Sequence, residues 1–125
     1  MGSGSDEGIR NTRTYRGNQE VKGTKNDSNK PAISLIPKDF LEETAAVFTF
    51  GAAKYGKHNF KQGIEISRTI DAAFRHLLAF NEGQDLDSES KLSHLGHAAA
   101  SIAMTIYNLK NNPQLDDRYR KPSAK

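Results

Sequence analysis

Apolar side chains recur at helical spacing in three stretches of the chain. In residues 39–56, apolar positions three or four apart share one face: Leu41, Ala45, Phe48, Ala52 and Tyr55. We expect this helix to begin at Asp39, whose carboxylate can cap free backbone N–H groups, with Glu42 completing a capping box. Gly56 is the expected stop. Gly51 lies inside the helix at a propensity cost of about 1 kcal/mol, and we expect close approach of another backbone or of a ligand to compensate.

Two further helices follow in the hydrophobic pattern. The second is predicted to start at a Ser67 cap and to end at Gly83. Its apolar stripe consists of Ile70, Phe74, Leu77 and Leu78. The third is predicted to run from about Ser90 to Asn111, because Pro113 prevents continuation. Its expected buried face consists of Leu92, Leu95, Ala99, Ile102, Ile106 and Leu109.

The absence of strand-like alternation predicts an all-α fold, a compact bundle of three main helices. Small residues between 98 and 103 make the third helix thin, so a neighbouring helix can pack closely. Helices this short bury little surface alone, so we expect a homo-oligomer, a dimer or higher, to complete the core. We divide the chain into a flexible or extended arm (1–30), the helical domain (31–112) and a basic C-terminal tail (113–125).

Composition removes several classes of protein. The formal net charge of +3 comes from the ends, since residues 1–30 and 113–125 each carry +2 and residues 31–112 carry −1. A DNA-binding domain would place its cations on a folded face, so a nucleic-acid partner is not expected. No apolar run approaches the roughly 20 residues that span a bilayer, and no signal-peptide core is present. The chain has no cysteine, which excludes disulfides and thiolate sites. We therefore expect a cytoplasmic protein without a membrane partner.

Histidine and arginine side chains supply the first candidate chemistry. His94 and His97 are three residues apart, so both leave the same face of the third helix. They could share a metal ion or bracket a phosphate group, or they could simply hydrogen-bond to neighbouring helices. On the second helix, Asp71 and Arg75 have ion-pair spacing, and His76 follows. A guanidinium at Arg75 would suit a phosphate, since its planar fork matches two oxygens.

An acidic loop precedes the helix that carries both histidines. Asp85, Asp87 and Glu89 alternate there, as the first ligands of an EF-hand do. An EF-hand is excluded, because Ser90 replaces the glycine at the sixth position and Gly96 replaces the glutamate at the twelfth. Oxygen ligands beside imidazoles would suit Mg²⁺ or Mn²⁺ acting on a phosphorylated substrate. The alternative is a solvated acidic turn that stabilises a helix N-terminus.

The end of the first helix combines aromatic rings, lysines and an amide. Lys54 and Tyr55 lie close to Asn59 in the segment from Phe50 to Phe60. A nucleotide needs a stacking face, hydrogen bonds to its base edge and neutralisation of its phosphates, and these residue types can supply all three. Tyr55 also continues the apolar stripe, so a packing role explains it equally. The chain contains no Walker loop, no G-x-G-x-x-G and no G-x-S-x-G.

An ordered set of short motifs resembles a known family over roughly residues 30–118. The motifs are Leu35-Ile36-Pro37, Phe50-Gly51-Ala52-x-Lys54-Tyr55-Gly56-x-x-Asn59-Phe60-x-x-Gly63, Ser67-Arg68, Arg75-His76-Leu77, Gly83-x-Asp85-x-Asp87-x-Glu89-Ser90, His94-Leu95-x-His97-Ala98-Ala99 and Asp116-Asp117-Arg118. Together they look like the phage-encoded dATP/dGTP diphosphohydrolase N-terminal-domain family, which is related to the MazG-like all-α nucleotide pyrophosphohydrolases.

The resemblance implies an oligomeric helical enzyme that hydrolyses purine (deoxy)nucleoside triphosphates to monophosphate and pyrophosphate with Mg²⁺ or Mn²⁺. Such an enzyme would edit the nucleotide pool of a phage-infected cell, in the host cytoplasm. The implied metal ligands are Asp85, Asp87, Glu89, His94 and His97. The catalytic candidates are Glu89, Asp87 and His76. The substrate-binding candidates are Lys54, Tyr55, Asn59, Arg68 and Arg75.

The chain departs from the family pattern in ways that keep other functions open. Phe60 stands where relatives usually have tryptophan, and Ser90 where they usually have glycine. The paired acids and the Glu-x-x-Asp of the MazG signature are absent, and His94-x-x-His97 occupies the latter place. A non-catalytic protein that sequesters a nucleotide or a nucleotide-derived signal is therefore the alternative. A scaffold or nucleic-acid accessory acting through the basic ends is a third hypothesis.

Overall fold

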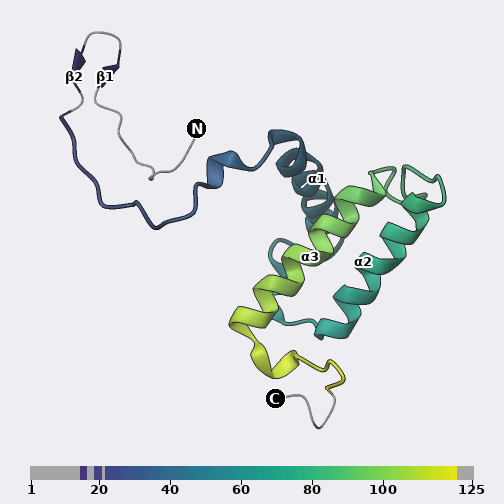
Figure 1. Ribbon diagram of the computed structural model, residues 1–125. Coiled ribbons are helices and arrows are strands. Elements are labelled where there is room, and N and C mark those ends of the chain that lie inside the picture. The colour runs from purple at the N-terminus through teal and green to yellow at the C-terminus, as the bar shows by residue number, and fades with distance from the viewer. Residues whose placement is uncertain (1–14, 17–18, 21, 121–125) are drawn as a thin grey trace. The chain divides into compact units, whose positions relative to one another are not determined.

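Figure 1 shows the computed structural model, which describes residues 15–16, 19–20 and 22–120. The described residues fall into two units, divided after Leu35. The elements of the first are β1 (Tyr15–Arg16), β2 (Gln19–Glu20) and the 3₁₀ turn η1 (Ile33–Leu35), with β1 and β2 paired antiparallel. Strands of two residues are too short to show alternation in a sequence. The all-α prediction is confirmed for the second unit, whose elements up to residue 120 are α1 (Lys38–Tyr55), η2 (Asn59–Gln62), α2 (Ile66–Asn81), α3 (His94–Asn111) and η3 (Pro113–Leu115).

The predicted cap of α1 is wrong, although its end is confirmed. The helix begins at Lys38, because the carbonyl of Pro37 already accepts hydrogen bonds from the N–H groups of Phe40 and Leu41. The proline ring fixes φ near the helical value and so allows the helix to start one residue earlier than expected. Asp39 therefore lies in the first turn, and no side chain caps this end. Gly56 ends the helix with a φ of 93°, which favours glycine.

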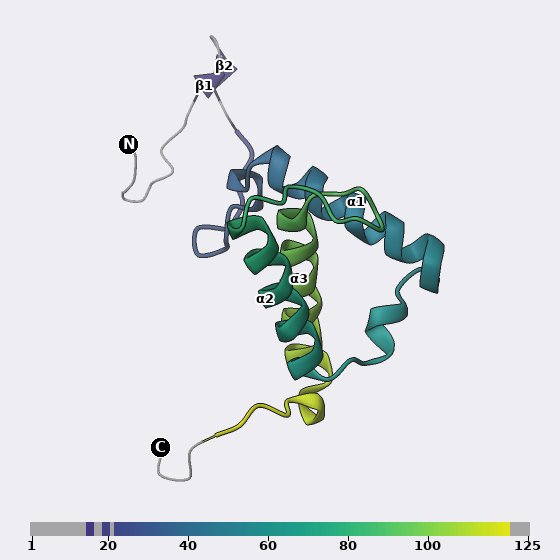
Figure 2. The ribbon, with the colours of Figure 1, turned by 90° about the vertical axis from the view of Figure 1, so that its right-hand side faces the viewer.

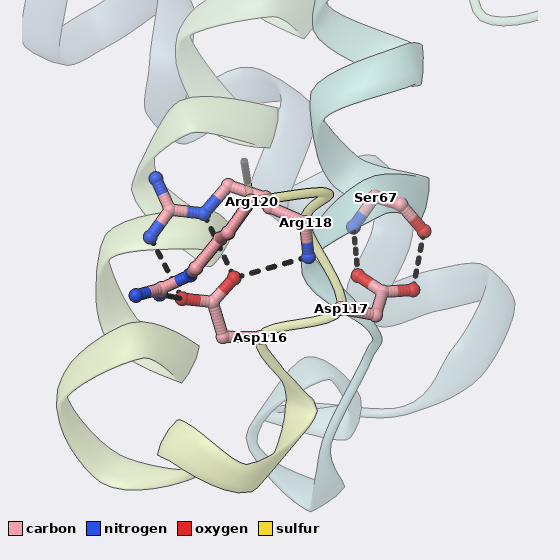
Figure 3. Close-up of polar contacts among 5 residues, drawn as sticks. All are labelled: Ser67, Asp116, Asp117, Arg118 and Arg120. Atoms are coloured by element: carbon pink, nitrogen blue, oxygen red, sulfur yellow. Dashed lines mark hydrogen bonds and ion pairs between the residues drawn. The ribbon is translucent and has the colours of Figure 1, made fainter. Parts of the chain in front are cut away.

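At the start of α2, the cap comes from the other end of the chain. Ser67 was predicted to be the cap, but the helix begins at Ile66, so Ser67 lies in the first turn. Its backbone N–H and its hydroxyl donate to the two carboxylate oxygens of Asp117, at 2.9 and 2.7 Å (Figure 3). These hydrogen bonds lower the pKa of Asp117 below its usual range. The neighbouring Asp116 accepts from Arg118 and Arg120. The segment after α3 thus holds the start of α2.

Helix α3 is the central element and packs against both α1 and α2. It begins at His94 and not at Ser90, because the preceding residues form a loop closed by backbone hydrogen bonds. Its end at Asn111 is as predicted. In Figure 2, α1 crosses the end of the α2–α3 pair that carries the start of α3. A Cβ built on Gly96 would lie 2.9 Å from the carbonyl oxygen of Glu43, so glycine permits this crossing. No described protein atom lies within 4 Å of the corresponding position at Gly51, so the backbone approach expected there occurs at Gly96 instead.

The buried face of α3 differs from the prediction. Leu95, Ile102 and Ile106 were expected inside and are about half exposed. Small and polar side chains take their place against α2, since a thin helix face lets the two backbones approach. The buried residues on this face are His94, Ala98, Ser101, Thr105 and Asn108. A buried hydrogen bond of 2.6 Å joins Thr105 to Thr69 of α2. The buried apolar core of the described residues consists of Val47, Ile66, Ala73, Ala98 and Ala100. None of the helices in the described part of the chain is long and apolar enough to cross a membrane.

Candidate functional site

The loop between α2 and α3 folds back on itself and fixes the acidic residues. The N–H of His94 donates to the carbonyl of Asp85 at 2.9 Å, and that of Asp87 donates to the carbonyl of Leu92 at 2.8 Å. One carboxylate oxygen of Asp87 accepts from the backbone N–H groups of Glu89 and Ser90, at 3.0 and 2.9 Å. These bonds favour the charged form, so the pKa of Asp87 lies below its usual value. Asp87 is therefore an ionised and well-positioned carboxylate.

Ser93 connects the start of α3 to α1. Its hydroxyl oxygen accepts from the N–H of Gly96 at 2.8 Å, which makes it the N-cap of α3. The same hydroxyl donates to the Glu43 carboxylate of α1 at 2.7 Å. One serine thus fixes both the first turn of the helix that carries His94 and His97 and the position of α1 across it.

Three of the chain's four histidines meet beside this loop. His76 from α2 and His94 from α3 approach through their Nδ1 atoms at 2.9 Å. The rings of His76 and His97 stack, with centroids 4.5 Å apart and planes 12° from parallel. The antiparallel arrangement of α2 and α3 brings together residues that are 18 and 21 positions apart in the sequence. His58, at the start of η2, is exposed.

The environment favours the neutral form of two of the clustered imidazoles, His76 and His97. Burial lowers the pKa of His76 below its usual 6.5, and positive charge on His97 or His94 would lower it further. Burial also lowers the pKa of His97, although the nearby charge of Asp87 acts in the opposite direction. Neutral imidazole is the form that binds metal ions. At neutral pH the lowered pKa values keep the rings of His76 and His97 in the neutral form.

Candidate metal ligands are His76, Asp87 and His94, whose ligand atoms all lie within 4.8 Å of one another. Two of the five predicted ligands, Asp87 and His94, are thus brought together, and His76, predicted to be catalytic, joins them. Two nitrogen donors and one ionised carboxylate form a donor set suited to a divalent transition metal. The chemistry of these residues therefore fits a metal ion.

The other predicted ligands have different contacts. His97 directs its Nε2 at the hydroxyl of Ser90, 2.6 Å away, and Ser90 also accepts from the N–H of Leu92. Glu89 forms an ion pair with Lys54. Asp85 contacts His94 through its backbone carbonyl. Ser90 therefore holds the ring that stacks on His76, a role that sequence reasoning missed because Ser90 lies in the loop before α3, where helical spacing does not apply.

Lys54 brings α1 into the site. Its ammonium lies 2.7 Å from the Glu89 carboxylate in the acidic loop. That hydrogen bond raises the pKa of Lys54 above its usual value. The ammonium also lies 5.2 Å from the centre of the Tyr55 ring. A cation, an aromatic ring and a carboxylate therefore occur together at the end of α1, within reach of the loop that contains Asp87.

The remaining predicted substrate residues are dispersed. Arg75 is exposed and directly precedes His76 in the sequence. In the described part of the chain it forms no ion pair with Asp71. Asn59 opens η2. Arg68 lies in the first turn of α2 and pairs with Glu65 at 3.4 Å, at the far end of the helix from the histidines. The structure thus brings Lys54 and Tyr55 to the acidic loop and leaves Arg68 away from it.

Comparison with known proteins gives two matches. The family model described as "dATP/dGTP diphosphohydrolase, N-terminal" matches residues 20–118. A protein named dATP/dGTP diphosphohydrolase from Salmonella phage PMBT28 is 42% identical over 98 residues, which cover 78% of this chain and 33% of the relative. The chain thus spans about a third of the length of the curated relative it matches. No solved structure matches the chain.

Proposed function

The chain belongs to the family of dATP/dGTP diphosphohydrolase N-terminal domains, and on that premise we propose that it hydrolyses purine (deoxy)nucleoside triphosphates to monophosphate and pyrophosphate. The observation that carries the proposal is the cluster of His76, His94 and Asp87 beside the Lys54–Glu89 pair. Metal-ligand donors, a further carboxylate and a cation are groups that phosphate chemistry uses. The name of the phage relative supports a purine triphosphate as substrate and, with it, a role in editing the nucleotide pool of an infected host's cytoplasm.

We assign the divalent ion to His76, Asp87 and His94. Mg²⁺ prefers an all-oxygen shell, whereas Mn²⁺ accepts imidazole, so the two nitrogen donors favour Mn²⁺ over Mg²⁺. The chemistry that such an ion supplies when bound is neutralisation of phosphate charge in the transition state. Asp87 suits a ligand role better than a base role, because its carboxylate is already held by two backbone N–H groups and its pKa is lowered.

The hydrogen bonds and ion pairs of the site also suggest roles for the residues that do not bind the metal. Glu89 is the general-base candidate, since its carboxylate is exposed and is held by one lysine, not by backbone N–H groups. Lys54 supplies the cation for a phosphate group. Tyr55 supplies a ring face beside that cation for the base. Arg75 adds a second exposed cation next to His76.

Turnover with each canonical dNTP and NTP tests the activity. With Mn²⁺ or Mg²⁺ present, the expected products are monophosphate and pyrophosphate from purine triphosphates, with little from pyrimidine ones. Absence of turnover with every nucleotide, at enzyme in large excess, would contradict the proposal. Nucleotide binding that persists in EDTA without turnover would instead support the sequestering alternative.

The metal assignment has a separate test that does not depend on turnover. Mn²⁺ should raise the melting temperature of the chain, because an ion that binds only the folded state stabilises it by mass action. A His94→Asn variant should lose that increase. His58→Asn is the matched control, since His58 is exposed and has the left-handed backbone conformation that asparagine tolerates. An equal Mn²⁺ effect on all three proteins would refute the assigned ligands.

A further inference from the structure

The chain segment that follows α3 turns back toward the start of α2. In this segment, Leu115 lies against Gly63, just before α2, and a Cβ built on that glycine would be 2.9 Å from the leucine Cδ1. Two residues further on, the Asp117 carboxylate accepts from the backbone N–H and the hydroxyl of Ser67, at 2.9 and 2.7 Å (Figure 3). We call residues 112–117 the return segment. Its side chains connect the end of α3 to the first turn of α2.

Asp116 holds the return segment to the residues that follow it. Its carboxylate accepts from two nitrogens of Arg118, at 2.8 and 2.7 Å, and from Arg120 at 2.6 Å. The Asp116 side chain is only 10% exposed, so water screens these ion pairs less than it screens an ordinary surface pair. The arginines therefore bind Asp116, and the Asp117 carboxylate is directed at Ser67.

The contact between α2 and α3 is lined by small side chains. Ala73, one turn after Thr69 and on the same face of α2, is buried there. Helices resist sliding when large side chains of one fit the grooves of the other, and small residues supply little of this resistance. Polar contacts therefore fix the position of α2 along α3. They are the Thr69–Thr105 bond of 2.6 Å near the start of α2 and the His76–His94 contact of 2.9 Å further along.

We propose that Asp117 is a positioning residue for the histidine cluster, acting through the position of α2 along α3. Ser67 and His76 lie in the same helix, nine residues or roughly 13.5 Å apart along its axis. Because an α-helix moves as a rigid element, a shift of Ser67 away from the return segment displaces the His76 ring as well. The inference rests on the metal assignment made above, in which His76 is the ligand that α2 supplies. Metal–ligand distances are fixed to within about 0.2 Å, so a small displacement is enough to weaken the site.

The backbone N–H of Ser67 reports directly on this coupling. In the first turn of an α-helix the N–H groups have no partner within the helix, so this N–H depends on Asp117 for its hydrogen bond. Linkage is reciprocal: if the return segment strengthens metal binding, a bound metal strengthens the return segment by the same factor. Mn²⁺ should therefore slow hydrogen exchange at the start of α2, and His94→Asn should abolish the slowing. An exchange rate that is unchanged at saturating Mn²⁺ would contradict the coupling.

Calorimetric titration of Mn²⁺ into the full chain tests the proposal. We expect Asp117→Ala to weaken Mn²⁺ binding by about 3- to 30-fold, the range usual for residues that couple to a distant site. Asp117→Asn should restore most of the affinity, because its amide can accept from the Ser67 N–H and donate to the Ser67 hydroxyl. Val47→Ala is the matched control. Val47 is buried on α1, so this variant loses stability, but its Mn²⁺ affinity should stay within about twofold of that of the parent chain.

The outcomes separate the positioning role from the metal assignment. If the parent chain binds Mn²⁺ and His94→Asn does not, but Asp117→Ala binds as tightly as the parent, the positioning role is overturned and the metal site stands. An equal loss of affinity in Asp117→Ala and Val47→Ala would also overturn it, since general destabilisation would explain both. A parent chain that does not bind Mn²⁺ overturns both proposals. Should Asp117→Ala fail to fold, Ser67→Ala removes one of the two hydrogen bonds and is compared in the same way.

Discussion

The substitution Gly96→Ala tests the crossing of α1 over α3. An alanine Cβ at this position would lie 2.9 Å from the carbonyl oxygen of Glu43 and 2.9 Å from the Ser93 hydroxyl. The Glu43 contact is with backbone, so relief requires α1 to move. Ser93 would lose its hydrogen bonds to Glu43 and to the first turn of α3 in the same movement.

The expected change in the free energy of unfolding of Gly96→Ala is the sum of one stabilising and two destabilising contributions. Alanine gains about 1 kcal/mol over glycine in helix propensity. Overpacking against a fixed neighbour costs about 1–3 kcal/mol, and loss of one charge-assisted hydrogen bond adds about 1.5–3 kcal/mol. The net change is a destabilisation of about 1.5–5 kcal/mol, or a melting temperature lower by roughly 6 °C or more for a domain of this size.

Gly51→Ala provides the matched control for this experiment. Gly51 also lies inside a helix, and no described protein atom is within 4 Å of its would-be Cβ. Its replacement should therefore raise the free energy of unfolding by up to about 1 kcal/mol. The assay is thermal unfolding followed by circular dichroism, with all proteins at one concentration because association shifts the midpoint. The reasoning is refuted if Gly96→Ala is as stable as the parent chain, or if both substitutions act in the same direction.

Three further predictions concern the polar contacts. Asp117→Ala should lower the melting temperature and speed hydrogen exchange in the first turn of α2, and adding Ser67→Ala should have little further effect; additive losses would show that the two residues do not act as a pair. Because the folded-state pKa values of His76 and His97 are lowered, their contribution to stability is fully present above pH 6.5 and declines as the pH falls below it. Melting temperatures that stay flat between pH 7.5 and 5 would contradict this. Thr105→Val should cost about 1 kcal/mol in a denaturant titration by removing the buried hydrogen bond to Thr69, whose hydroxyl keeps its bond to the carbonyl of Ile66.

The sequence predicts the approximate positions of the three helices and the C-terminal ends of α1 and α3. It does not predict which surface packs against each helix face. Periodicity placed Leu95, Ile102 and Ile106 together on one side of the third helix, because apolar residues three or four positions apart share a helix face. It does not report whether the covering surface belongs to the same chain, so a stripe that the single chain leaves exposed was assigned to its interior. The cap at Ser67 failed for a related reason, since its partner Asp117 is 50 residues away.

In the candidate site, too, features set by local sequence could be predicted, and features set by tertiary contacts could not. Helical spacing placed His94 and His97 on neighbouring positions of one face, and both contact the cluster. The meeting of His76 with His94 depends on the register between two antiparallel helices, which no local pattern encodes. The alternating acids look equivalent in the sequence. In the folded loop, however, Asp87 accepts hydrogen bonds from backbone N–H groups, whereas Glu89 accepts one from Lys54. Only tertiary contacts separate those roles.

In the site proposed above, the ion pair between Lys54 and Glu89 makes phosphate binding an exchange of one anion for another at the lysine. Both side chains are exposed, so the pair is weak and is screened by salt. A triphosphate carries more charge than one carboxylate and competes for the same ammonium group. In the proposed site, each phosphate that reaches Lys54 therefore displaces Glu89. The Glu89 carboxylate is held by Lys54 while the site is empty. It becomes free to accept a proton only when a substrate is bound. Substrate binding therefore activates the base without any movement of a domain.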